Sequence, residues 1–130
     1  MASYPPARVP SQQVISYLRK KITYADNGKA LVVGTIPAGA LIIKPMSGMQ
    51  VTTVFNAGTN NYVDIGTTAD DDLFGTDLSG AALAFVPLDE AIGGFRVAAD
   101  TTITATVGLT GTAATAGEAE VVICYAAVEG

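Results

Sequence analysis

The sequence predicts an all-β protein, a single antiparallel β-sandwich or jelly roll of about eight strands with an extended N-terminal arm. Short apolar or alternating segments follow one another at spacings of roughly 8 to 12 residues per strand and turn, as in antiparallel sandwiches and barrels. Gly, Pro, Asn and Asp separate these segments, and almost none of them has helical periodicity. The length of 130 residues fits one domain, which at this size needs no disulfide to hold its core.

The first residues are predicted to form an extended arm. Pro5, Pro6 and Pro10 lie in a polar context and exclude both a helix and a central strand. We assign the arm to residues 1–12 and the β-sandwich domain to residues 13–130. Because the arm adds little to the core, we expect either a tail that binds a partner or a tail that is merely disordered.

The segment 14–23, VISYLRKKIT, is the first predicted strand. Its alternate residues give two faces, and neither face is cleanly apolar. This is typical of an edge strand, or of a strand that a partner completes, on which Arg19, Lys20 and Lys21 prevent uncontrolled pairing. The turn 25–28 then contains Asn-Gly, whose preference for positive φ angles predicts a tight hairpin.

The central part of the chain alternates strands and turns. In the segment MQVTTVFN, Met49, Val51, Thr53 and Phe55 share one face, as a half-buried strand requires. The predicted strands of this part are 29–36, 41–45, 49–56 and 62–66, with turns at 37–39 and 57–61.

The segment 66–80 interrupts the alternation. Thr67 or Thr68 is expected to cap one helical turn, with the acidic run 70–72 near its N-terminus. The length and final proline of 81–87 favour a strand there, whereas its alanines favour a helix. The remaining predictions are strands at 95–99, 102–107 and 118–128, the last of them central, and a flexible loop at 108–118.

Charge and hydropathy narrow the classes of function. Charged residues make up 15% of the chain and the mean hydropathy is +0.39, so we expect a partner to cover part of the surface. Residues 1–50 hold six basic residues and one acid, whereas residues 51–130 hold one basic residue and eleven acids. The net charge of -5 disfavours a nucleic-acid partner. The sequence has neither an apolar run of about 18 residues nor a signal peptide, so we expect no membrane partner.

The residue types do not indicate an enzyme. The chain has no histidine, the commonest general base and transition-metal ligand, and its one cysteine, Cys124, lies in an apolar segment typical of a core strand. We predict no catalytic, cofactor-binding or metal-binding residues and no cofactor. The run 70–72 lacks the alternating ligands of a calcium loop. A hydrolase pair of Asp64 with Asp89 or Glu90 is a minor alternative that no motif supports.

Three stretches combine Gly- and Thr-rich turns with flanking strands. They are Phe55-Asn56-Ala57-Gly58-Thr59, Gly66-Thr67-Thr68-Ala69-Asp70, and Thr115-Ala116-Gly117 before a Val-Val-Ile strand. In this pattern, over residues 28–126, the chain resembles the small capsid decoration or cement proteins of tailed bacteriophages. The resemblance implies a β-sandwich or jelly roll that self-associates, binds the major capsid protein and has no enzymatic activity.

The arm and the basic strand indicate where such a protein docks. We expect the arm to lie across a neighbouring subunit, and the basic strand to meet an acidic surface of the shell or of a second copy. The expected partners are the major capsid protein and the protein itself, as a homodimer or higher oligomer, on the capsid surface of a virion. The predicted interface residues are Tyr4, Pro5, Pro6, Arg8, Arg19, Lys20 and Lys21.

The main alternative is a fibre or receptor-binding module of a phage virion. Such a module contacts host carbohydrate, and sugar-binding platforms display exposed aromatic rings. The chain has five Tyr and four Phe residues, which are scattered along the sequence. The rings available for this role are those of Tyr4, Tyr17, Tyr24 and Tyr62.

Overall fold

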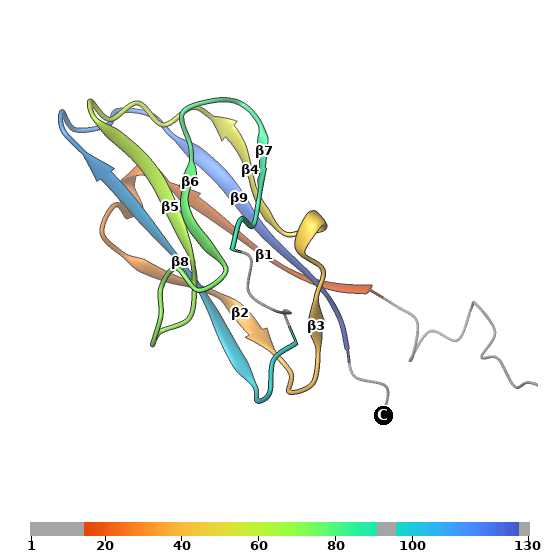
Figure 1. The fold of residues 1–130 in the computed structure, drawn as a ribbon. Coiled ribbons are helices and arrows are strands. Elements are labelled where there is room, and N and C mark those ends of the chain that lie inside the picture. The colour runs from red at the N-terminus through yellow and green to blue at the C-terminus, as the bar shows by residue number, and fades with distance from the viewer. Residues whose placement is uncertain (1–14, 91–95, 128–130) are drawn as a thin grey trace, which may run out of the picture.

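The computed structural model describes residues 15–90 and 96–127, which form a β-sandwich of two antiparallel sheets (Figure 1). The described helical elements are two 3₁₀ turns, η1 (Tyr24–Asp26) and η2 (Lys44–Met46), and no helix there is long and apolar enough to cross a membrane. The strands are β1 (Ile15–Thr23), β2 (Ala30–Ile36), β3 (Leu41–Ile42), β4 (Gly48–Thr53), β5 (Asn60–Gly66), β6 (Gly75–Ser79), β7 (Phe85–Pro87), β8 (Thr101–Thr110) and β9 (Glu118–Ala126). The predicted all-β sandwich is confirmed, with nine strands in the described residues where about eight were expected.

The strand order is that of a jelly roll. Sheet A has the order β1-β9-β4-β7, with β3 also pairing with β9, and sheet B has the order β2-β8-β5-β6. With the two-residue β3 set aside, the first strand pairs with the last, the second with the second-last, and so on inward to the hairpin of β5 and β6. This nested pairing rolls one long antiparallel ribbon into two layers.

Strand β9 lies at the centre of sheet A, as its sequence predicts. It pairs with β1 along one side and with β4 and β3 along the other. Ala119, Val121 and Ile123 are at most 1% exposed and face the core, while the alternate residues lie on the outer face of the sheet. Cys124 is buried with a free thiol, as expected for a structural cysteine.

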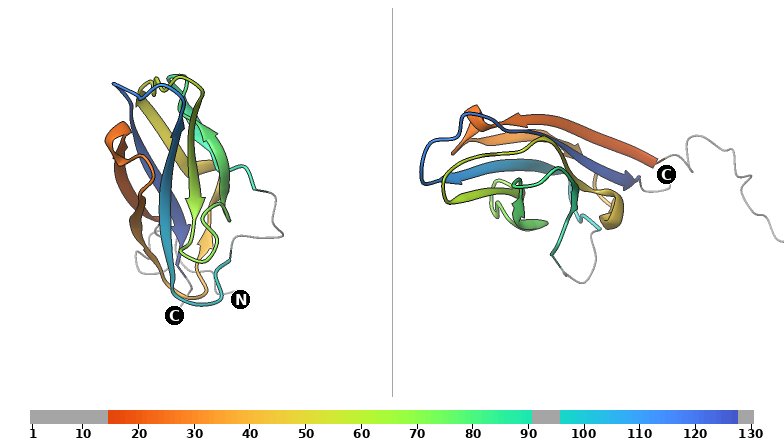
Figure 2. Two further views of the ribbon diagram at one scale, coloured as in Figure 1. Left: turned by 90° about the vertical axis from the view of Figure 1, so that its left-hand side faces the viewer. Right: turned by 90° about the horizontal axis from the view of Figure 1, so that it is seen from above.

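The core lies between the two sheets, whose layers are visible in Figure 2. Met49, Val51 and Phe55, which the sequence places on one face of 49–56, are at most 2% exposed. Thr53, the fourth residue of that set, is exposed. From the opposite sheet, the core receives Val63, Ile65, Ile103 and Val107.

The turn 25–28 is not the hairpin that Asn-Gly predicts. β1 and β2 belong to different sheets, and η1 carries the chain from one sheet to the other. Asn27 has a φ of -51°, outside the positive range of a type I′ turn, whereas Gly28 has a φ of +80°. The Asn27 side chain donates from Nδ2 to the backbone O of Leu109 at 3.2 Å and accepts at Oδ1 from the backbone N of Leu109 at 2.9 Å. The turn therefore reverses the chain, but β2 then pairs with β8 instead of β1.

The segment 67–74 forms a turn without a helix. Thr67 caps this turn, because its Oγ1 accepts a hydrogen bond from the backbone N of Asp70 at 3.2 Å, but the chain then bends back into β6. Gly66 allows the bend, since a Cβ atom at this position would lie 2.2 Å from the backbone O of Asp70. The loop thus crosses directly over the end of β5.

The loop predicted as flexible at 108–118 is shorter and is held in place. β8 continues through Thr110, so the loop between β8 and β9 covers residues 111–117. Asn56 Oδ1 accepts hydrogen bonds from the backbone N of Thr115 at 2.8 Å and of Ala116 at 3.0 Å. One side chain therefore fixes the loop that leads into β9.

Three of the predicted strands keep at most three described residues in a strand. The segment 41–45 leaves the sheet after Ile42 and enters η2, where Pro45 has no backbone N–H for a sheet hydrogen bond. In 81–87, only the last three residues form a strand. In 95–99, residue 95 lies outside the described residues, and Arg96 makes an isolated bridge instead of a strand.

Candidate docking surface

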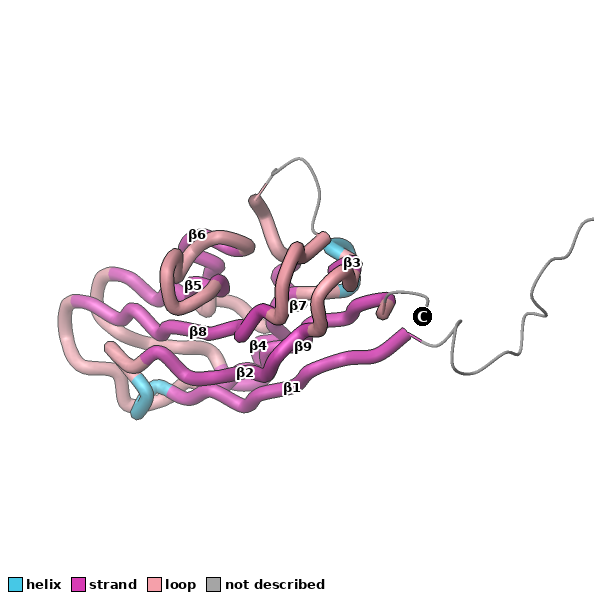
Figure 3. Tube along the Cα trace, turned by 90° about the horizontal axis from the view of Figure 1, so that it is seen from below, coloured by secondary structure: helices cyan, strands magenta, loops and turns pink. Residues whose placement is uncertain are grey.

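β1 is an edge strand, as its mixed faces predict. It pairs with β9 along one side and has no strand along the other in the described part of the chain, and Figure 3 shows it at the margin of the sheet. The register places Arg19 opposite Val122 and Lys21 opposite Glu120, so both basic side chains leave from the outer face of sheet A. An open edge offers unpaired backbone groups to a partner, and its charged side chains limit that pairing.

Arg19 and Lys21 form ion pairs within the chain. Arg19 Nη2 lies 2.7 Å from Glu120 Oε2, and Lys21 Nζ lies 3.1 Å from Glu118 Oε1. The hydrogen bond to Glu120 raises the pKa of Arg19 above its ordinary value, so the guanidinium stays charged. Both pairs run diagonally between β1 and β9, within the reach of long side chains. Two of the three basic residues of β1 predicted for the interface therefore lie beside acids of β9.

The side chain of Lys20 leaves β1 on the face opposite to that of Arg19 and Lys21. It stands opposite the fully buried Val121, so its side chain leaves from the other face of β1 at the open edge. On this same face Leu18 closes the gap to β2, since a Cβ atom on Gly34 would lie 2.8 Å from Leu18 Cδ2. Lys20 is exposed, and it is the one of the three basic residues without an ion pair in the described residues.

The predicted arm residues Tyr4, Pro5, Pro6 and Arg8 lie outside the described residues. The arm, its boundary with the sandwich and the predicted interface therefore stay predictions. β1 begins at Ile15, so the chain enters the sandwich at the open edge of sheet A.

An apolar row that sequence reasoning missed lies at the start of β1. Ile15 of β1 and Leu41 of β3 both stand opposite Ala126 of β9, so the three residues form one row across the outer face of sheet A. Tyr17 follows in the next row on the same face. Ile15, Tyr17 and Leu41 are 44%, 60% and 39% exposed. No local sequence pattern predicts this row, because Ile15 and Leu41 are distant in sequence and are brought together only by pairing with the same strand, β9.

The tyrosines considered for sugar binding do not gather on one surface. Tyr17 lies on the outer face of sheet A, Tyr24 in η1, and Tyr62 in β5 of sheet B. Tyr4 lies outside the described residues. The three described rings are exposed, but rings on three separate elements do not form one stacking platform.

The acids considered for hydrolysis hold β6 in place. Asp64 Oδ1 accepts a hydrogen bond from the backbone N of Asp77 at 2.7 Å. Asp89 Oδ1 accepts one from the backbone N of Thr76 at 2.9 Å, and Glu90 accepts one from the Thr76 hydroxyl. Burial is the largest cause that raises the pKa of Asp64. These contacts give the three acids a structural role.

The acidic run 70–72 brings three carboxylates together. One oxygen of each carboxylate lies within 4.8 Å of the others, and the hydrogen bond between Asp72 and Asp70 raises the pKa of Asp72. Asp70 and Asp71 are exposed, as expected for a solvated run, and Asp72 is half-buried. Converging carboxylates are common on protein surfaces, and by themselves they do not define a metal site.

The fold is similar to that of a chain in a phage capsid. A chain of the "Cyanophage Pam1 capsid asymmetric unit" aligns with a TM-score of 0.59 and 15% sequence identity, over 88% of this chain and 84% of that chain. No protein-family model matches the sequence, and no curated protein matches it. At this level of identity the likeness shows a shared fold: the two-sheet architecture described above also occurs in a chain of a cyanophage capsid asymmetric unit.

Proposed function

We propose that this chain is a structural protein of a phage virion that binds the outside of the capsid shell and stabilises it. In this proposal it contacts the major capsid protein and further copies of itself, and it has no enzymatic activity. The observation that carries the proposal is the fold, since 88% of the chain aligns with a chain of a phage capsid asymmetric unit. The motifs at 55–59, 66–70 and 115–117 support it through their resemblance to capsid decoration proteins.

The open edge of sheet A suits a docking role. A protein that coats a shell needs exposed edges and self-complementary surfaces more than it needs ionisable chemistry. β1 supplies an unpaired edge, and Ile15, Tyr17 and Leu41 add exposed apolar area beside it. Because Arg19 and Lys21 are already paired with acids of β9, Lys20 is the described residue of the predicted interface that is available to an acidic partner.

Binding to purified shells tests the proposal. Shells that lack the protein are mixed with the full chain, with a deletion of residues 2–12, or with Lys20→Glu, and the fraction that sediments with the shells is measured. We expect saturable binding of the full chain, a sharp reduction for the deletion, and weaker binding for Lys20→Glu and at moderate salt. Lys29→Glu makes the same charge change in the turn before β2 and serves as a matched control that binds like the wild type.

Each result has a separate meaning. If the full chain does not bind shells, the capsid role is wrong. If the deletion and Lys20→Glu bind as fully as the wild type, and salt has no effect, the partner docks on a face of the sandwich. The copy number on native particles separates a cement protein, present in many copies, from a fibre module, present in few.

Self-association is tested on the isolated protein. The low charge and high mean hydropathy predict an oligomer, with a symmetric dimer as the simplest form. Sedimentation velocity at micromolar concentration should show a species heavier than the 13.2 kDa chain. A monomer alone would contradict self-association in the absence of the shell.

A further inference from the structure

β1 presents the backbone groups of alternate residues along its open edge. The backbone N of Tyr24 donates to the backbone O of Gly117 at 3.1 Å, one residue beyond the pair of Thr23 and Glu118, so Tyr24 points toward β9. The register of β1 and β9 has no shift, and backbone groups alternate in direction along a strand. Thr23 fits this alternation, because its N–H turns away from β9 and donates to Asp26 Oδ2 at 2.9 Å. The residues whose N–H and C=O groups point away from β9 are therefore Ile15, Tyr17, Arg19 and Lys21.

The hydrogen bonds of β9 agree with this assignment. Cys124 stands opposite Tyr17 and turns its backbone groups away from β1. Its N–H donates to Ser47 Oγ at 2.9 Å, and its C=O accepts from the backbone N of Ile43 at 2.8 Å. Tyr17 and Cys124 are thus a pair without backbone hydrogen bonds between them, and no strand in the described part of the chain takes up the groups of Tyr17.

One antiparallel register makes β1 complementary to a second copy of itself. With a two-fold axis at Leu18, Ile15 stands opposite the partner's Lys21, and Tyr17 stands opposite the partner's Arg19. Every residue that points out of the edge is then in a hydrogen-bonded pair. The register sets an aromatic ring beside a cation, and an exposed apolar side chain beside the methylene groups of a lysine. No like charges stand directly opposite each other on this face.

The other face of β1 fits the same register. Ser16 stands opposite the partner's Lys20, and Leu18 stands opposite the partner's Leu18 on the axis. Leu18 is half-buried, packs against the core and closes the gap to β2 beside Gly34. The pair of leucines therefore extends the apolar core of one copy toward that of the other.

The neighbouring registers are less favourable. Moving the axis by one residue keeps the outward-pointing residues opposite each other, but an axis at Arg19 sets two arginines directly opposite. An axis at Tyr17 leaves Lys21 opposite a residue outside β1. With the axis at Leu18, the two arginines are only diagonal neighbours, and each is held by its own Glu120 at 2.7 Å. The ion pairs with β9 thus reduce the repulsion between two basic edges.

We propose that two copies of the chain join by antiparallel pairing of their β1 strands about a two-fold axis at Leu18, which makes one continuous sheet of the two A sheets. The inference rests on the self-association in the proposed function and names its surface and register. The axis is perpendicular to the sheet, so the outer faces of both A sheets lie on the same side of the dimer. A single large partner can therefore contact both copies at once.

A disulfide at the axis tests the register directly. The two copies of Leu18 form a pair without backbone hydrogen bonds, in which the Cα atoms lie about 4.5 Å apart, a separation that a disulfide spans. Leu18→Cys should therefore give a cross-linked dimer with oxidised glutathione, seen on a non-reducing gel. Ser16→Cys is the matched control on the same face of β1, because its two copies lie about 14 Å apart along the strands and should stay uncross-linked. Cys124 is buried, and the wild type measures its background.

Charges at residue 16 test the same register at equilibrium. Sedimentation gives the Kd of the dimer, and circular dichroism checks that each variant is folded. Ser16→Lys sets like charges opposite each other at two symmetric places and should raise the Kd about fivefold, whereas Ser16→Glu should lower it by about the same factor. Lys20→Glu added to Ser16→Lys restores opposite charges and should return the Kd to the wild-type value or below. Lys20 has no ion pair in the described residues, so its replacement breaks none there.

The outcomes separate this inference from the capsid role. Cross-linking through Leu18→Cys, together with the expected order of Kd values, supports the inference even if the dimer does not bind shells, and that result refutes the capsid role alone. A wild type that binds shells but stays monomeric at micromolar concentration overturns this inference alone. Equal cross-linking of Ser16→Cys, or a Kd that does not respond to the charge at residue 16, also overturns it, and the copies then meet on another surface.

Discussion

Replacing Thr104 with valine removes a buried hydroxyl and keeps the size and β-branched shape of the side chain. Thr104 is 4% exposed, and its Oγ1 has no hydrogen-bond partner among the described residues. An unsatisfied buried polar group costs about 1–3 kcal/mol, and valine suits a strand at least as well as threonine. We therefore expect Thr104→Val to raise the free energy of unfolding by about 1–3 kcal/mol.

Thr102→Val is the matched control for this prediction. Thr102 lies two residues away on the same face of β8, and its Oγ1 is 3.1 Å from the Oγ1 of Thr35 in an exposed hydrogen bond. Removing this hydroxyl should lower the free energy of unfolding by at most about 1 kcal/mol, a change of the opposite sign. Urea unfolding followed by circular dichroism measures both variants, and a shifted midpoint at an unchanged slope reports a change in stability.

A lower free energy of unfolding in Thr104→Val would refute the reasoning. It would mean that the Thr104 hydroxyl has a hydrogen-bond partner in solution, such as a water molecule held between β8 and the loop 67–71.

Three further changes test other parts of the structure. Ser47→Ala removes a fully buried hydroxyl that donates to the backbone O of Ile43 at 2.8 Å and accepts from the backbone N of Cys124 at 2.9 Å; we expect a loss of about 2 kcal/mol in urea unfolding. Asp64→Asn keeps an acceptor but removes a carboxylate whose pKa burial raises; the wild type therefore loses stability as the pH rises through that pKa. The variant should melt at a higher temperature than the wild type at neutral pH, and this gain should disappear below the ordinary pKa range of Asp. Gly48→Ala should lower the melting temperature strongly, because at a φ of +156° its Cβ would lie 2.1 Å from a backbone oxygen of β7. Unchanged midpoints for Ser47→Ala or Gly48→Ala, or a pH-independent effect of Asp64→Asn, would contradict the packing assigned to these residues.

Local patterns predict the strands whose burial alternates. In 49–56, Met49, Val51 and Phe55 are buried as their spacing indicates, and 118–128 contains the central strand of sheet A. In both segments, one face packs against the core and the other lies on the outer side of the sheet. The sequence therefore alternates with a period of two.

No local sequence pattern predicts which strands pair with each other. Asn27-Gly28 marks a reversal of the chain in either case, but only contacts distant in sequence decide that β1 pairs with β9 and β2 with β8. The same register supplies Glu118 and Glu120 to Lys21 and Arg19, so the basic patch predicted on β1 is partly neutralised. Sequence reasoning could identify these charges but could not pair them.

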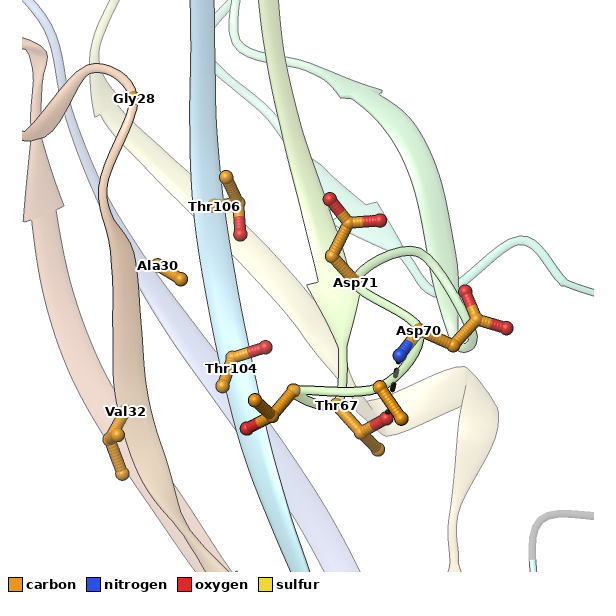
Figure 4. Close-up of a pocket in the computed structure, with 10 residues that line it drawn as sticks. Gly28, Ala30, Val32, Thr67, Asp70, Asp71, Thr104 and Thr106 are labelled. Atoms are coloured by element: carbon orange, nitrogen blue, oxygen red, sulfur yellow. Dashed lines mark hydrogen bonds between the residues drawn. The ribbon is translucent and has the colours of Figure 1, made fainter.

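The burial of Thr104 beside the loop 67–71 (Figure 4) illustrates a second kind of missing information. The alternate threonines of 102–107 are visible in the sequence, and their exposure to solvent would be the ordinary expectation for the outer face of a sheet. Thr104 is buried because the loop 67–71 folds over the sheet, and the sequence of that loop predicted a helical turn instead. Covering of one element by another is a tertiary effect that neither segment signals alone.

The nested strand pairing also limits the order in which the strands can pair during synthesis of the chain. The hairpin of β5 and β6 needs only neighbouring residues and can form early, whereas joining Ile15 to Ala126 closes a loop of roughly a hundred residues. Sheet A cannot close until 118–126 has left the ribosome, because β9 lies between β1 and β4. The row of Ile15, Ala126 and Leu41 is thus incomplete until β9 joins sheet A, because both outer members of the row meet Ala126 of that strand.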